Sequence, residues 1–257
     1  MKKQLFLFAL SLLVSGSSLR AQTPVSNAIN DLTLPIYSED GNNGVAVAYD
    51  PAKALYYTSY AGNASYPIEV FDAYGSSRYT GAIGADIRGM WYNPATKRLE
   101  GILYDNTGGF FITLDMNGTP LNNNITAFSY GMDAQAVATY DPVKKQVIFV
   151  QSNEVHLFKA NSRKAKKVKL QPASEGVQLV QSPLWTGVKG YEIGLLEAGE
   201  TVLYLFDIKS GKQSARIKLS DYYGTEPVYA FNISYCNGHV WLYDKGTRTW
   251  YGYQIFN

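Results

Sequence analysis

Cysteine and histidine are nearly absent from this chain. Its 257 residues contain one cysteine, Cys236, and two histidines, His156 and His239. A single cysteine cannot form an internal disulfide, so the core alone must hold the fold. Two histidines on separate repeats argue against Ser-His-Asp, Cys-His and zinc chemistry, and no phosphate loop of the GxxxxGK type is present. We therefore expect no metal, no cofactor and no recognisable catalytic residues.

Excess charge and long apolar runs are also missing. The formal net charge is only +2, which gives no overall field favouring nucleic acid. The one apolar run, residues 5–14, follows two lysines and leads into small residues ending at Ala21. This layout is typical of a secretory signal, and no later run approaches the ~20 residues that span a bilayer. We expect cleavage after Ala21 and a secreted, periplasmic or cell-surface monomer without a membrane span.

Tyrosine is abundant, and it marks an internal repeat. The chain has 21 tyrosines and 23 glycines, which suits an all-β protein. The phrases "AYDPAKALYY", "MWYNPATKRLEG" and "ATYDPVKKQVIF" each contain one tyrosine on which they align. When this alignment is continued through the chain, the equivalent positions are Tyr49, Tyr92, Tyr140, Gln181 and Tyr235, at intervals of 43, 48, 41 and 54 residues. A second series keeps the same period at Phe71, Leu114, Phe158, Phe206 and Tyr253. Such a period, with four short β segments in each unit, predicts a propeller.

The turns and the chain ends complete this prediction. The Asp-Pro and Asn-Pro pairs suit tight turns capped by the Asx side chain, which is a structural rather than a catalytic role. The last unit supplies only three strands, so residues 26–36 should complete it and close the ring. We predict one domain, residues 22–257, forming a five-bladed β-propeller of four-stranded antiparallel blades. The expected blades cover residues 44–83, 87–128, 133–170, 176–220 and 226–257 plus 26–36.

Two sets of phrases carry a resemblance to a known group. "YDPAK", "YNPATK" and "YDPVKK" resemble the turn after the innermost strand of bacterial exported β-propellers with NHL-like or YVTN-like repeats. "EVFDAYG" and "YLFDIKSG" resemble the third strand of those repeats. The resemblance covers all five units, and it implies a disc-shaped binding scaffold, since enzymes are a minority of such proteins.

The loops divide into two faces of opposite charge. We call the face of the turns after first and third strands the lower face, and it should be basic because it carries Lys53, Lys97, Lys144 and Lys189. The opposite, upper face should carry one acid per blade, with tyrosines beside several of them. The candidate ligand-binding residues on the upper face are Asp40, Asp86, Asp133, Glu175, Glu226, Tyr130, Tyr222 and Tyr223.

Three functions fit these features. A non-enzymatic binding protein would use the upper face to hold a glycan or a protein partner through acceptors and aromatic faces. A hydrolase resembling five-bladed glycosidases would use the same acids as acid and base. A structural component of a surface assembly would need an apolar patch instead. Against any site, the acids could simply cap their own turns. The scarcity of catalytic groups favours binding.

Overall fold

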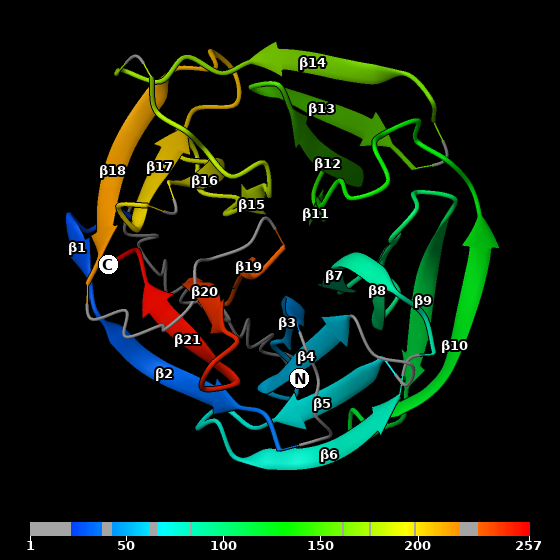
Figure 1. Cartoon of the computed structure of the whole chain (residues 1–257). Helices are drawn as coiled ribbons and strands as arrows, with labels where there is room; N and C mark the ends of the chain where they lie inside the picture. Colours follow the sequence, from blue (N-terminus) through cyan, green and yellow to red (C-terminus); the bar gives the residue numbers. More distant parts are fainter. Residues whose placement is uncertain are drawn as a thin grey trace, which may run out of the picture.

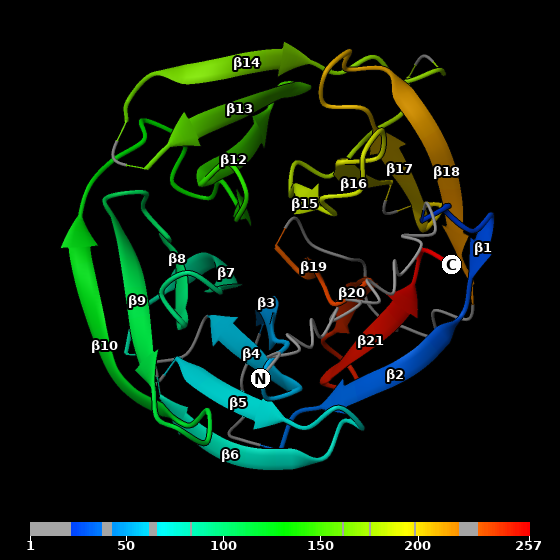
Figure 2. The ribbon, with the colours of Figure 1, turned by 180° about the vertical axis from the view of Figure 1, so that it is seen from behind.

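The computed structural model describes residues 22–37, 43–61, 66–82, 84–160, 162–174, 176–197, 199–220 and 231–257. Five β-sheets stand around a central axis, and each runs from an innermost strand near the axis to an outer strand at the rim (Figure 1). The view from behind shows the same closed ring (Figure 2). The predicted five-bladed propeller is therefore confirmed. Among the described residues, no helix has the length and apolarity that crossing a membrane requires.

The strands of each blade follow one another along the chain from axis to rim, except that the outer strand of blade five comes from the N-terminal segment. Blades one and two contain β3 (Asn43–Asp50), β4 (Leu55–Ala61), β5 (Pro67–Phe71), β6 (Ser77–Ala82), β7 (Ile87–Asn93), β8 (Arg98–Leu103), β9 (Gly108–Leu114) and β10 (Pro120–Ala127). Blade three contains β11 (Ala138–Asp141), β12 (Gln146–Gln151), β13 (Glu154–Lys159) and β14 (Ala165–Lys169). Blades four and five contain β15 (Leu184–Trp185), β16 (Ile193–Glu197), β17 (Val202–Phe206), β18 (Gln213–Leu219), β19 (Ile233–Cys236), β20 (His239–Asp244) and β21 (Thr249–Gln254).

Burial falls from the axis to the rim, as the sequence pattern requires. The innermost strand β3 is buried on both faces, because Val47 packs with blade five while Ala46 and Ala48 pack with blade two. The outer strand β10 is exposed along almost its whole length. Inner strands therefore read as continuous apolar runs, and outer strands are polar.

The Asx-Pro turns have the capping role that the sequence predicts. The Asp50 carboxylate accepts the backbone N–H of Ala52 at 2.9 Å, and the Asn93 side-chain oxygen accepts that of Ala95 at 3.1 Å. The Asp141 carboxylate accepts the N–H groups of Val143 and Lys144. These side chains stabilise the turns at the lower ends of the innermost strands.

The N-terminal segment closes the ring, as predicted, and it also reaches a second blade. Strand β2 (Asn30–Pro35) pairs antiparallel with β21 as the outer strand of blade five. Strand β1 (Asn27–Ala28) adds in parallel to β18 of blade four, which the sequence pattern did not predict. Leu34 of β2 belongs to an apolar core cluster that we call the closure seam. The residues of this cluster are Leu34, Ile36, Val47, Tyr56, Tyr60, Phe71, Trp241, Tyr243 and Trp250. The seam joins the segment of β2 and the rest of blade five to blade one without a disulfide.

Candidate axial binding site

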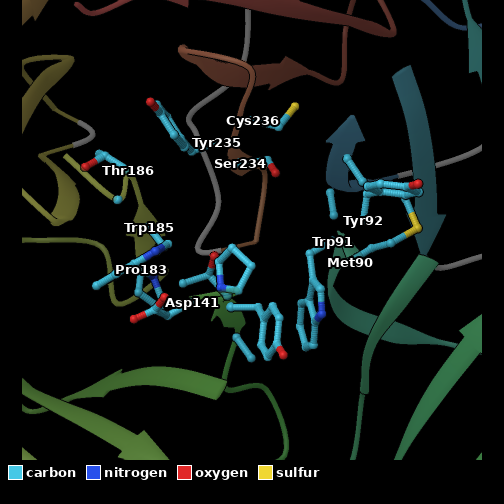
Figure 3. A pocket seen from close by; sticks show the side chains of 18 of the residues that line it. Met90, Trp91, Tyr92, Asp141, Pro183, Trp185, Thr186, Ser234, Tyr235 and Cys236 are labelled. Carbon is cyan, nitrogen blue, oxygen red and sulfur yellow. The ribbon is translucent and has the colours of Figure 1, made fainter. Parts of the chain in front are cut away.

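A cavity of about 430 Å³ lies on the propeller axis. Side chains and backbone of all five innermost strands, β3, β7, β11, β15 and β19, line it together with the turns that follow three of them. Trp91, Tyr92, Trp185 and Tyr235 stand around the cavity (Figure 3). The cavity is therefore a property of the closed ring, since no single blade forms it.

Each blade contributes one aromatic residue to this lining at the same position of its innermost strand. Strand pairing shows the equivalence: Tyr49 lies opposite Tyr56 in blade one, as Trp185 lies opposite Ile193 in blade four. The five equivalent residues, all of which line the cavity and are half-buried, are Tyr49, Tyr92, Tyr140, Trp185 and Tyr235. We call them the aromatic ring.

The structure corrects one member of the sequence alignment. Gln181 was aligned with the tyrosines, but it lies in the exposed loop before β15 and its side chain accepts the N–H of Ser152 at 3.1 Å. Trp185 occupies the equivalent position instead. The error arose because the turn after β15 is longer than an Asx-Pro turn, so matching the proline displaced the alignment.

The aromatic ring is held by contacts between neighbouring blades. The Tyr92 hydroxyl donates to the Asp50 carboxylate of blade one, and burial together with this carboxylate raises the pKa of Tyr92. Tyr140 is hydrogen-bonded to Asn93 of blade two, and its ring stacks on Trp91 with centroids 5.3 Å and planes 11° apart. Tyr92 and Tyr140 are thereby fixed in orientation, while their half-buried surfaces still reach the cavity.

The cavity opens on the lower face. The exposed residues of its lining all belong to the turns that follow the innermost strands: Pro142, Val143, Lys144, Gly187, Lys189 and Asn237. At the other end the lining residues Val45, Val137 and Ile233 are buried. Asp86 precedes β7 and Lys97 follows it, so strand alternation separates the faces as expected. A ligand would enter past the lysines.

Two carboxylates line the cavity, and both are already engaged. The Asp141 carboxylate caps its turn, and the Glu192 carboxylate accepts the N–H of Ile208 at 3.2 Å. Burial raises the pKa of the Cys236 thiol well above its usual range. Neither histidine lines the cavity. In the described part of the chain, no three His, Cys, Asp or Glu side chains are grouped so that they could hold a metal ion.

The structure places three of the residues predicted for the upper face outside the cavity lining. Asp86 pairs with Arg88 at 2.6 Å, and the buried Arg88 guanidinium lies between the rings of Tyr104 and Phe231. The Asp133 carboxylate accepts the side-chain amide of Gln151 at 2.7 Å.

Tyr130 packs against the rings of Phe128, Phe149 and Phe158. The other predicted site residues lie outside the described part of the chain: Asp40, Glu175, Glu226, Tyr222 and Tyr223. Whether this face binds a ligand stays a prediction. Four members of the aromatic ring, Tyr49, Tyr92, Tyr140 and Tyr235, were visible in the sequence as a repeat landmark, but their position on the axis was not recognised there.

Comparison with known proteins supports the fold. No family model and no curated protein matches the sequence. The glutaminyl cyclase of Myxococcus xanthus superposes with a TM-score of 0.61 at 10% identity, covering 91% of this chain and 98% of that one. The Cps50 (Swd1) β-propeller domain of Myceliophteria thermophila gives 0.45 at 9% identity, covering 86% and 85%. Virginiamycin B lyase of Staphylococcus aureus gives 0.43 at 11% identity, covering 82% and 66%. At 10% identity the likeness to the cyclase concerns the fold and not an activity.

Proposed function

We propose that this protein is a non-enzymatic binding protein that holds the ring of a small ligand, such as the terminal sugar of a glycan, in the axial cavity. One observation carries the proposal: five half-buried aromatic side chains, one from each blade, converge on a single cavity of about 430 Å³. That volume falls within the roughly 300–1,000 Å³ of small-molecule sites. Aromatic faces pack against the apolar C–H faces of a sugar ring, and tyrosine hydroxyls meet its polar edge.

The lining favours binding over catalysis. Proton-transfer chemistry needs acid and base groups with tuned proton affinity facing one substrate position. Here Asp141 and Glu192 sit on different blades and accept backbone N–H groups. Binding asks only for a shaped cavity with a few polar contacts. The basic start, apolar run and small residues of positions 1–21 support a place outside the cytoplasm for this activity.

The positions of the four tryptophans allow a direct test. Trp91 and Trp185 line the cavity, whereas Trp241 and Trp250 are fully buried elsewhere. A sugar that enters the cavity should change tryptophan fluorescence, and the change should disappear in the double variant Trp91→Phe/Trp185→Phe. We would titrate the mature chain with glucose, galactose, mannose, N-acetylglucosamine and glucuronic acid, and would assay hydrolysis of their nitrophenyl glycosides in parallel.

Matched variants separate this site from the upper face. Trp185→Ala should weaken sugar binding at least about tenfold, because a buried aromatic anchor contributes about 1.4 kcal/mol or more. Tyr74→Ala, at a side chain 89% exposed outside the cavity lining, is the control and should bind normally. If no sugar changes the fluorescence, or if Asp133→Ala abolishes binding while Trp185→Ala does not, the axial site is wrong. Measured turnover would instead favour the hydrolase.

A further inference from the structure

At the turns around the mouth of the axial cavity, lysine side chains are exposed, whereas the carboxylates are hydrogen-bonded and not exposed. Four carboxylates lie at these turns, and each accepts hydrogen bonds from its surroundings: Asp50, Glu100, Asp141 and Glu192. None of the four is exposed, and Asp50 and Asp141 are almost completely buried. The exposed charged side chains at the same turns are all lysines: Lys97, Lys144, Lys145 and Lys189. An approaching ligand therefore meets ammonium groups first.

Two of these lysines belong to the cavity itself. Lys144 lies in the turn after β11 and Lys189 in the turn after β15, so they flank the mouth from the adjacent blades three and four. Neither forms an ion pair with any residue that the structure describes. This contrasts with Lys53 of blade one, whose ammonium group pairs with Asp50 at 3.2 Å. The two cavity lysines are thus free to engage a ligand.

The aromatic ring and the lysines favour ligands of opposite charge, and together they restrict the class of ligand that the cavity can bind. Aromatic faces alone would also attract cations. Two unpaired ammonium groups at the entrance repel a cation and attract an anion, and the attraction is strengthened at the edge of a partly dehydrated cavity. We infer that the ligand is an acidic sugar, with its ring against the aromatic residues and its anionic substituent at Lys144 and Lys189. This inference rests on the proposed function.

Matched pairs of sugars test the charge separately from the site. We would titrate the mature chain, by tryptophan fluorescence, with glucuronate against glucose, galacturonate against galactose, and glucose 6-phosphate against glucose. At low salt the acid member of at least one pair should bind about tenfold more tightly, which corresponds to about 1.4 kcal/mol. The comparison of glucose 6-phosphate with glucose shows whether the site distinguishes a carboxylate from another anion. Raising the salt from about 0.05 M to 0.5 M should reduce the preference, because it shortens the screening length.

A charge-removing variant locates the preference at the mouth. Lys144→Gln/Lys189→Gln should bring the affinities of the acid and neutral members to within about twofold of each other. The control Lys166→Gln/Lys169→Gln removes the same charge from exposed positions of the outer strand β14 and should keep the preference.

The outcomes distinguish the two proposals. Equal or tighter binding of the neutral sugars, or an acid preference that survives Lys144→Gln/Lys189→Gln, overturns the inference and leaves the axial binding site standing. Fluorescence that responds to no member of any pair overturns the binding site, and the inference fails with it.

Discussion

The closure seam and the aromatic ring use the same kinds of side chain for different purposes. In the seam, Trp241, Trp250 and Tyr243 are at most 2% exposed, and Tyr243 contacts Trp250 with ring centroids 5.2 Å apart. In the aromatic ring, Tyr92 and Trp185 are half-buried at the ends of innermost strands. Burial rather than residue type separates the two regions. Aromatic residues in the seam should determine stability, and those at the mouth should determine binding.

The largest expected loss of stability follows from a substitution in the closure seam. Trp250→Ala removes a fully buried side chain and should lower the free energy of unfolding by about 3–5 kcal/mol. Trp185→Ala removes a half-buried one and should cost about 1–2 kcal/mol. Urea unfolding followed by circular dichroism measures both. Equal losses for the two variants would show that the mouth is as structural as the seam.

High pH should destabilise the closure seam, because its buried tyrosine Tyr243 must ionise. Burial is the main reason that the pKa of Tyr243 is raised to about 12, from an ordinary value of about 10. Because the folded state holds the proton more tightly, this stabilisation is complete below about pH 10 and is lost as the pH rises towards 12.

The variant Tyr243→Phe isolates this contribution. Above about pH 10 its stability should fall less steeply than that of the wild type, by at most about 1.4 kcal/mol per pH unit. Tyr74→Phe, at an 89% exposed position, should follow the wild type. Tyr92→Phe at the mouth should lie between them, since a half-buried phenol is less dehydrated. Identical slopes for all three variants would contradict the difference in burial.

The smallest effect concerns acid pH and lies outside both regions. His156 on β13 is 9% exposed, and its burial, with nearby Lys167, lowers the pKa of the imidazole. The unfolded chain then takes up this proton first, so stability should fall modestly as the pH drops below about 6.5. His156→Gln should flatten that fall in urea titrations.

Sugar binding should stay constant between about pH 6.5 and 8, because no histidine lines the cavity. Loss of binding in that window would place a histidine at the site.

Blade four shows where prediction from sequence reaches its limit. Its innermost strand, β15, has only two residues, too few for alternation to identify it. The aligned tyrosines of blades one to three were found because an Asx-Pro turn follows each of them. Blade four has a longer turn, so Trp185 was missed and Gln181 was taken in its place. Local patterns locate regular elements well, and they lose accuracy where a loop replaces a standard turn.

The sequence by itself determined the number of blades, the capped turns and the closure by the N-terminal strand, because all three depend on local patterns repeated at one period. It also assigned Asp86 and Lys97 to opposite faces through strand alternation. Only the tertiary structure decided that Tyr49, Tyr92, Tyr140, Trp185 and Tyr235 share one cavity, and that this cavity opens on the lower face. The physical reason is that the cavity arises from how closely five blades approach the axis, and that spacing depends on contacts between blades far apart in sequence.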